Sequence, residues 1–380
     1  MKQGWEIRKL GEIILENKKS TLKSKGNEVG EYPFFISGMK VKTYNKSIID
    51  GQNIYLPTGG NFYVHFYEGK ASYSTDTWSL RTCKNTDIKY FYFFLLLNRD
   101  FINEKHFKGA TIKHLQKKDF REIELPLPPL PEQQRIVAIL DEAFAAIAKA
   151  KANAEQNLKN ANELFESYLQ GVFENKGEDW EERTIGEVCE LIDSLHKTPK
   201  YNKDGEFPMV RVTEIKYGNL DISGALRVDE DIYKEFSKKH IPKIGDIVFS
   251  RVGASFGVSS LVVSNELFCL GQNTVFIVPK LNPYYCYHFL NSRVARSQMN
   301  KLVAGAAQPT ISLKSIKELN IPIPPTNQIE KIVGQIDSVS EETKKLETIY
   351  QQKINDLEGL KKSVLQKAFS GELKTAKALV

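Results

Sequence analysis

The sequence lacks the long apolar run that a membrane-spanning helix needs. Its longest apolar stretch, YFYFFLLL at residues 90–97, is far shorter than the roughly 20 residues that cross a bilayer. No basic stretch followed by an apolar segment stands at its start, so no secretory signal is expected. Only four cysteines are present, and no two have the Cys-x-x-Cys spacing of a zinc site or a small disulfide framework. These absences predict a reduced, cytosolic protein with no membrane partner and no metal site.

The motifs of nucleotide and metal chemistry are missing as well. No Gly-x-Gly-x-x-Gly follows a strand-like run, no phosphate-binding Gly-Lys-Ser/Thr loop occurs, and the six histidines form no His-Glu-x-x-His pattern. The Pro-Pro pairs at 128–129 and 324–325 are not the Asn-Pro-Pro-aromatic loop of a DNA amino-methyltransferase. The sequence therefore predicts no catalytic residue and no cofactor bound by this chain.

One group of residues leaves an enzymatic alternative open. Asp204 is followed by Glu214 and Lys216, an acid and then Glu-x-Lys, which is the pattern that metal-dependent nucleases use. Such spacing is common by chance, and the plainer interpretation is a surface turn at the edge of the strand-like PMVRVTEI. If the pattern were a catalytic site, the chain would be a stand-alone metal-dependent nuclease with duplicated DNA-binding bodies, and this alternative stays open.

Length and charge indicate several domains and a polyanionic partner. A chain of 380 residues exceeds one ordinary core, and 41% hydrophobic with 26% charged residues is typical of globular protein. Residues 1–125 contain 21 Lys and Arg against 14 Asp and Glu, and residues 236–301 contain eight against two. Local basic patches of this kind suit a polyanion, although ordinary solvated surface has the same composition.

The sequence repeats itself. LPLPPLPEQQRIVAILDE at 125–142 returns as IPIPPTNQIEKIVGQIDS at 321–338, and WEIRKLGEIILE from Trp5 returns as WEERTIGEVCELI from Trp180. The period is close to 190 residues, so each copy is a domain rather than a solenoid unit. A structural coiled-coil adaptor would account for the helices described below but not for two basic bodies of this size.

The proline phrase predicts an extended segment that leads into a helix. Each proline disfavours the helical region for the residue before it. In the first copy Pro131 suits the first helical position, and in the second Asn327 with Glu330 has capping-box spacing. Apolar residues then recur every three or four positions for about 40 residues, which is roughly 60 Å of helix. We expect the two helices to pack antiparallel on each other, with a helix that lies on its own domain as the alternative.

The expected fold class is α+β, with two tandem domains of mixed sheet and helices separated by two long antiparallel coiled-coil helices. Short β-rich runs broken by glycine turns predict the sheets, and an aromatic helix is expected at 88–100 and again at 283–299. The boundaries are 1–130 for the first domain, 131–175 for the first long helix, 176–325 for the second domain, and 326–380 for the second long helix with its tail.

The chain resembles the specificity subunit of type I restriction-modification systems over essentially its whole length. The motifs that carry the resemblance are LPPLPEQQRIVAILD at 127–141, IKHLQKKDFREIELPLP at 112–128 and GDIVFSRVGASFG at 245–257. The second proline phrase departs from the family's Glu-Gln-Gln and reads Asn-Gln-Ile-Glu at 327–330. That departure leaves the fold unaffected but puts partner contacts at this point in doubt.

The resemblance implies a non-catalytic DNA-reading subunit. Two target-recognition domains would each read one half of an interrupted site in double-stranded DNA. The helices would set the gap and dock two methyltransferase subunits, to which restriction subunits are added. S-adenosylmethionine, ATP and magnesium would then bind partner subunits only.

Candidate DNA-binding residues flank glycine-rich turns in both bodies. Lys and Arg are suited to phosphates, Arg also to guanine, and Gln and Asn to adenine, while plain surface or turn chemistry is the alternative for each. The candidates are Lys40, Lys42, Thr75, Arg81, Lys113 and His114 in the first body, and Arg211, Ser250, Arg251, Gln272, Asn273 and Lys314 in the second.

Overall fold

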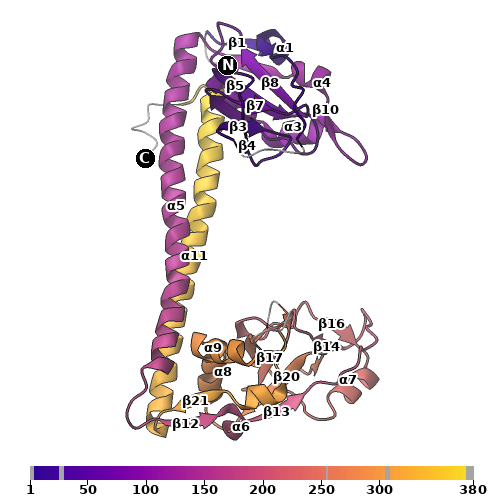
Figure 1. The fold of residues 1–380 in the computed structure, drawn as a ribbon, viewed down its shortest axis with the longest axis vertical. Coiled ribbons are helices and arrows are strands. Elements are labelled where there is room, and N and C mark those ends of the chain that lie inside the picture. The colour runs from indigo at the N-terminus through magenta and orange to yellow at the C-terminus, as the bar shows by residue number, and fades with distance from the viewer. Residues whose placement is uncertain (1–3, 25–29, 254–255, 304–308, 374–380) are drawn as a thin grey trace. The chain divides into compact units, whose positions relative to one another are not determined.

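The computed structural model describes residues 4–24, 30–253, 256–303 and 309–373 (Figure 1). The chain forms two compact units, one of residues 1–155 with 351–380 and the other of residues 156–350. Two helices, α5 (Leu130–Glu174) and α11 (Thr326–Ser370), each contribute to both units. Helices therefore occupy the segments where the apolar spacing predicts them, and each unit takes part of both.

Unit 1 contains two main sheets. The larger is antiparallel with the order β2-β8-β5-β6, and the smaller has the order β4-β3-β7 with β3 and β7 parallel. The strands are β1 (Glu6–Lys9), β2 (Ile14–Glu16), β3 (Tyr32–Phe35), β4 (Lys42–Tyr44), β5 (Gln52–Pro57), β6 (His65–Glu68), β7 (Ser72–Tyr73), β8 (Thr77–Thr82), β9 (Phe107–Lys108), β10 (His114–Leu115) and β11 (Glu124–Leu127).

The helices of unit 1 cover the larger sheet and complete its core. They are α1 (Leu10–Ile13), α2 (Ile88–Leu97), α3 (Arg99–Lys105) and α4 (Lys117–Arg121). The core joins Leu80 of the sheet and Phe91 of α2 to Leu140 of α5 and Ala368 of α11, all of them buried. The single aromatic helix expected at 88–100 is wrong in detail, because Asn98 separates two helices.

Unit 2 repeats this plan. Its larger sheet has the order β13-β20-β17-β18-β15, and its smaller sheet has the order β16-β14-β19 with β14 and β19 parallel. The strands are β12 (Glu181–Thr184), β13 (Cys189–Asp193), β14 (Phe207–Val210), β15 (Gly218–Asn219), β16 (Leu226–Val228), β17 (Ile247–Ser250), β18 (Ser259–Leu261), β19 (Cys269–Leu270), β20 (Thr274–Pro279) and β21 (Asn320–Ile323). The helices are α6 (Ile185–Val188), α7 (Glu230–Phe236), α8 (Pro283–Asn291), α9 (Arg293–Leu302) and α10 (Leu313–Lys317), and α8 and α9 again replace one expected helix.

The proline phrase forms the same extended strand in both units. In β11 and β21 it pairs antiparallel with β1 and β12, with Glu6 opposite Leu127 and Glu181 opposite Ile323. A buried tyrosine fixes each copy, since the Oη of Tyr90 donates to the Pro126 carbonyl and that of Tyr285 to the Pro322 carbonyl, both at 2.6 Å. The extended-then-helix interpretation is confirmed.

Within unit 1 the two long helices run antiparallel. Arg135 Nη2 donates to the carbonyl of Leu373 at 3.4 Å, and farther along α5 Lys151 pairs with Glu358. Rising numbers on α5 therefore meet falling numbers on α11. In unit 2 Phe173 of α5 and Ile329 of α11 belong to one buried cluster. The helices also bury residues against the body of each unit, so the two packing arrangements considered for them occur together.

The capping prediction for the second long helix is wrong. The helix α11 begins at Thr326, so Asn327 lies inside its first turn rather than at its cap. A capping box forms instead at α6, where the Thr184 backbone N–H donates to Glu187 Oε2 at 2.6 Å. Backbone and side-chain hydrogen bonds from Thr184 hold the pKa of the Glu187 carboxyl below its ordinary value.

Candidate nucleic-acid interface

Five loop segments of unit 1 converge at one end of its sheets. We call residues 22–24, 36–42, 58–60, 74–76 and 113–114 the first edge. The Asp76 carbonyl accepts hydrogen bonds from the backbone N–H and the Oγ1 of Thr58, both at 3.0 Å, and from Ser37 Oγ. The Thr75 N–H donates to the carbonyl of Leu22 at 2.8 Å. These bonds join loops that lie far apart in the sequence.

The first edge gathers five of the six candidates proposed in unit 1. Lys40 is exposed in the loop after β3, and Lys42 Nζ donates to the Ser24 carbonyl at 3.4 Å. The Lys113 carbonyl accepts from the Gly60 N–H at 2.8 Å, which places His114 beside it. One surface thus presents five candidates, which are Lys40, Lys42, Thr75, Lys113 and His114.

Arg81 is the sixth candidate and lies elsewhere. It is an exposed residue of β8 opposite Leu15 of β2. Thr77, at the edge end of the same strand, is about 13 Å away at roughly 3.3 Å per residue. The sequence could not distinguish Arg81 from the candidates of the first edge, because all of them are basic or polar residues close to turns.

Two exposed apolar side chains also belong to these loops and were not among the candidates. Met39, beside Lys40, is 67% exposed, and Ile112, beside Lys113, is 61% exposed. The turn that carries Ile112 needs a glycine at Gly109, where φ is +150° and a Cβ would lie 2.3 Å from the Ile112 carbonyl oxygen. An apolar residue directly before a lysine near a glycine turn is the sequence signal that would have pointed to both Met39 and Ile112.

Unit 2 presents the same hydrogen-bond frame. We call residues 193–198, 211–214, 251–253, 271–273 and 310–311 the second edge. The Arg251 N–H donates to the Asn273 carbonyl at 2.9 Å, as the Thr58 N–H donates to the Asp76 carbonyl in unit 1. Likewise Ile311 N donates to the Arg251 carbonyl at 3.1 Å, as Leu115 N does to the Thr58 carbonyl. The register agrees, because Thr77 faces Pro57 and Thr274 faces Ser250.

Ser250 and Arg251 have structural places in this frame. Ser250 ends the central strand β17 and has 0% exposure, so its hydroxyl does not reach a base edge. The Arg251 guanidinium donates to Asp193 Oδ1 and to the Ile311 carbonyl, both at 3.0 Å, and the side chain is 12% exposed. Arg251 therefore links the loops of the second edge to one another.

Arg211 is also engaged by the protein. Its guanidinium forms two hydrogen bonds with the carboxylate of Glu214, at 3.1 and 2.6 Å. Burial raises the pKa of Glu214, but hydrogen bonds from Arg211 and Thr213 outweigh it and hold that pKa below its ordinary value. Arg211 therefore stabilises the turn after β14.

The nuclease alternative finds no support in this region. Glu214 is committed to Arg211, while Asp204 is an exposed turn residue whose N–H donates to Asn202 Oδ1 at 3.1 Å. Among the described residues, no group of three or more His, Cys, Asp or Glu side chains could hold a metal ion. The pattern at residues 204–216 is the surface turn that the plainer interpretation predicts.

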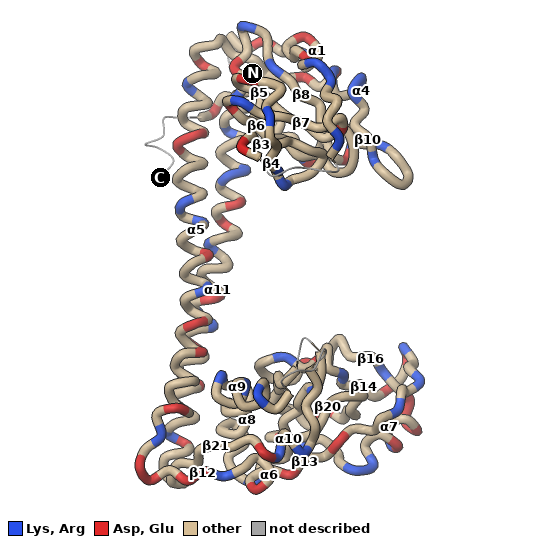
Figure 2. The backbone as a smooth tube through the Cα atoms, viewed as in Figure 1, with Lys and Arg blue, Asp and Glu red and all other residues tan. Residues whose placement is uncertain are grey.

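The remaining candidates of unit 2 are available at the surface. Gln272 is exposed, with its Nε2 3.5 Å from Thr198 Oγ1, and Asn273 is half-buried with φ of +64°. Lys314 follows the edge in α10, has an 87% exposed side chain and lies 3.9 Å from a carboxylate oxygen of Glu318. Figure 2 shows lysines and arginines in both units, including positions on α9.

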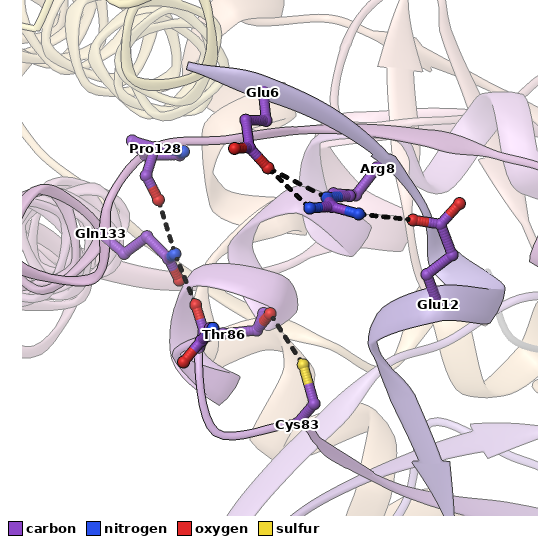
Figure 3. A network of polar contacts seen from close by, with 8 residues as sticks. Glu6, Arg8, Glu12, Cys83, Thr86, Pro128 and Gln133 are labelled. Carbon is purple, nitrogen blue, oxygen red and sulfur yellow. Dashed lines mark hydrogen bonds and ion pairs between the residues drawn. The ribbon is translucent and has the colours of Figure 1, made fainter. Parts of the chain in front are cut away.

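The first proline phrase is fixed by a glutamine that the second phrase lacks. The Oε1 of Gln133 accepts from the Asp87 N–H at 2.8 Å, and its Nε2 donates to the carbonyls of Asn85 at 3.0 Å and Pro128 at 2.8 Å. Figure 3 shows Gln133 reaching Pro128, close to the Cys83–Thr86 contact. Counting from the strand registers, the equivalent residue is Ile329, which is 6% exposed in the core of unit 2.

The two units thus repeat one α+β fold, and each presents a polar and partly basic edge. A family model described as the type I restriction modification DNA specificity domain matches residues 2–159 and again 177–356. The chain belongs to this family. The resemblance inferred from the proline phrases is confirmed, and the chain is accordingly grouped with specificity subunits rather than with catalytic ones.

Known relatives extend over most of the chain. It is 24% identical to the type I restriction enzyme MjaVIII specificity subunit of Methanocaldococcus jannaschii, over 98% of this chain and 93% of that one. It is 27% identical to the EcoKI specificity subunit of Escherichia coli K12, over 70% of this chain and 61% of the relative. Both relatives are named as specificity subunits.

Solved structures share the fold. A chain from a structure of the assembly and conformational transition of a type I restriction-modification system has a TM-score of 0.77 at 18% identity, covering 98% of this chain and 99% of that one. The HsdS subunit of Thermoanaerobacter tengcongensis has a TM-score of 0.57 at 18% identity, with 98% of each chain covered. The expected α+β class is confirmed. Across the described residues, no helix has the length and apolar character to span a membrane.

Proposed function

We propose that this chain is the non-catalytic DNA-specificity subunit of a type I restriction-modification enzyme and that it reads an interrupted target in two halves. The observation that carries the proposal is the pair of edges. The two units hold equivalent loops with equivalent backbone bonds, Thr58 to Asp76 and Arg251 to Asn273, yet the side chains on the two frames differ. Two similar frames with different side chains suit two different half-sites.

Exposed cations would supply the sequence-independent part of binding. Lys40, Lys113 and Lys314 have exposed side chains on or beside the edges, and such residues neutralise phosphates with release of counterions. Polar side chains such as Thr75 and Gln272, fixed on the same frames, would read base edges. We keep the cytoplasmic location expected from the sequence as part of the proposal, since the ligand would be DNA inside the cell.

The long helices would serve as a scaffold and a ruler. Each has 45 residues, about 67 Å at 1.5 Å per residue, and we propose that they set the number of unread base pairs between the half-sites. They would also dock two methyltransferase subunits, which restriction subunits join. S-adenosylmethionine, ATP and magnesium would bind those partners and not this chain.

The test is to express the chain with its cognate methyltransferase in a host that lacks other adenine methylation, and to map methylated positions by sequencing. The proposal predicts one methylated motif with two specified parts and a fixed unspecified gap, and no methylation when this chain is omitted. A continuous motif, or the same motif without this chain, would contradict it. Purified chain incubated with DNA and magnesium should leave the DNA uncut.

A further inference from the structure

Asp76 is an exposed acidic residue on an edge that is otherwise basic or neutral. Within the described residues its carboxylate has one hydrogen-bond partner, Ser24 Oγ at 3.4 Å, and no ion pair with a lysine or arginine. Lys40 and Lys113 belong to the neighbouring loops, and Lys42 begins β4. An exposed carboxylate repels phosphate, so Asp76 would weaken the sequence-independent attraction of this surface for DNA.

The backbone of Asp76 is held firmly. Its carbonyl accepts from the backbone and side chain of Thr58 and from Ser37 Oγ, and its N–H donates to Ser74 Oγ at 3.3 Å. Ser74 Oγ is in turn 3.0 Å from Thr77 Oγ1 in the buried end of the sheet. The carboxylate therefore projects from a fixed point, as a group that reads a base must.

Asn273 occupies the equivalent position on the second edge. Its carbonyl accepts from the Arg251 N–H, and it directly precedes Thr274 as Asp76 precedes Thr77. Its φ of +64° lies in the left-handed region, which asparagine tolerates better than most side chains, whereas Asp76 does not have a left-handed φ. The same point of the frame thus carries a carboxylate, which only accepts, in one unit and a carboxamide, which also donates, in the other.

We infer that Asp76 and Asn273 are specificity-determining residues at matching positions of the two half-sites. Asp76 accepts a hydrogen bond from the exocyclic amino group of a base in the major groove, the N4 amino group of cytosine. Asn273 pairs with the N6 and N7 groups of adenine. The inference rests on the proposed function and assigns one base in each half-site by hydrogen-bond chemistry.

The Asp76 carboxylate would distinguish bases in two ways, by attracting an amino group and by repelling a carbonyl oxygen. Guanine O6 and thymine O4 are acceptors, so either would face the Asp76 carboxylate with like partial charge and leave it without a donor. Repulsion of the wrong base contributes to specificity as much as attraction of the right one. A good side-chain pair on a base edge discriminates by about 5- to 150-fold.

The experiment is Asp76→Asn in the full chain, expressed with the methyltransferase and scored by the methylated motif. The variant should lose the requirement for cytosine at one position of one half-site and accept adenine there, with the other half-site and the gap unchanged. Asp50→Asn is the matched control. Asp50 precedes β5 and accepts from the Gly51 N–H, roughly 20 Å of strand away from the edge, and it should leave the motif unchanged.

Asn273→Asp is the reciprocal variant and should replace adenine by cytosine at one position of the other half-site. Loss of an adenine requirement in Asp76→Asn would overturn the inference, because asparagine is the side chain assigned to adenine. An unaltered motif, or a change confined to A·T base pairs, would overturn it as well. A uniform loss of methylation with an unchanged melting temperature would overturn it too. If the wild-type chain gives no motif, the proposed function itself fails.

Discussion

Gln133 offers the sharpest test of how the chain enters its first long helix. Its buried carboxamide bonds the Asp87 N–H and the carbonyls of Asn85 and Pro128, so one side chain ties the proline phrase to the loop before α2. The change Gln133→Ala removes all three bonds and leaves their backbone partners without replacement.

The magnitude follows from the groups left behind. A buried polar group that loses its partner costs about 1–3 kcal/mol, and the Gln133 bonds to Asp87 and Asn85 are only partly buried. Three groups near the lower end of this range predict that unit 1 is destabilised by about 2–4 kcal/mol. That corresponds to a roughly 30- to 700-fold change in the opening equilibrium.

The assay is native-state hydrogen exchange of the full chain, read at the buried Phe91 amide of unit 1, whose own acceptor, the Asp87 carbonyl, is kept in the variant. Because the chain has two units, a local probe is preferable to one global unfolding curve. Gln134→Ala is the matched control, since Gln134 is the next residue of the same helix and is exposed. It should change stability by no more than about 0.5 kcal/mol.

A Gln133→Ala variant that exchanges no faster than Gln134→Ala would refute this reasoning. The reciprocal change, Ile329→Gln, puts a carboxamide into the apolar core of unit 2, where Ile329 is 6% exposed. It should destabilise unit 2 and leave exchange of the Phe91 amide in unit 1 unaffected.

Four further outcomes are expected. Arg251→Ala should destabilise unit 2 by about 2–3 kcal/mol in urea unfolding, because Asp193 loses its guanidinium; an unchanged midpoint would argue against a structural role. Lys113→Ala should reduce the slope of log affinity against log salt by about 0.9 in the assembled complex, and an unchanged slope would remove Lys113 from the phosphate contacts. The pKa of Glu214 in the folded chain lies below its ordinary value of 4.5. The stabilising contribution of Glu214 is therefore fully present above pH 4.5 and is lost as the pH falls through the folded pKa. Glu214→Gln should therefore differ from wild type in urea midpoint at neutral pH and converge with it in acid, and a constant difference would contradict this. Four residues inserted after both Lys151 and Glu358 add about 6 Å of helix, which should lengthen the unread gap by one or two base pairs and leave both half-sites unchanged.

The sequence was sufficient for features that local rules control. Prolines that exclude helix and apolar residues at three-four spacing depend on nearby residues only, so the extended phrase and the helices α5 and α11 follow from them. The duplication was visible because both copies repeat the same motifs in the same order. The capping box was misplaced because α11 begins two residues earlier than a cap at Asn327 requires, which is within the usual spread of helix ends.

Features that depend on distant residues could not be predicted. Ser250 resembles a turn residue before Val252 and Gly253, but β17 lies between β18 and β20 and buries every residue that it contains. Arg251 meets Asp193 across 58 positions, and Gln133 meets Asp87 across 46. Only the tertiary structure brings such pairs together.

The candidates of the first edge are more exposed than those of the second. Its candidates Lys40 and Lys113 lie on exposed loops, whereas Arg211 and Arg251 of the second edge pair with acids inside unit 2. Basic residues near glycine turns thus include both exposed lysines and arginines that form ion pairs within the fold. The acids that distinguish them are Glu214, three positions away, and Asp193, far away in the sequence.

The most direct test of the central claim is the methylation motif of a host that carries this chain and its methyltransferase, compared with a chain in which residues 4–125 come from a relative of different specificity. If each unit reads one half of the target, the exchange should replace one half-site and preserve the other half-site. A motif that changes in both halves, or in neither, would contradict the account.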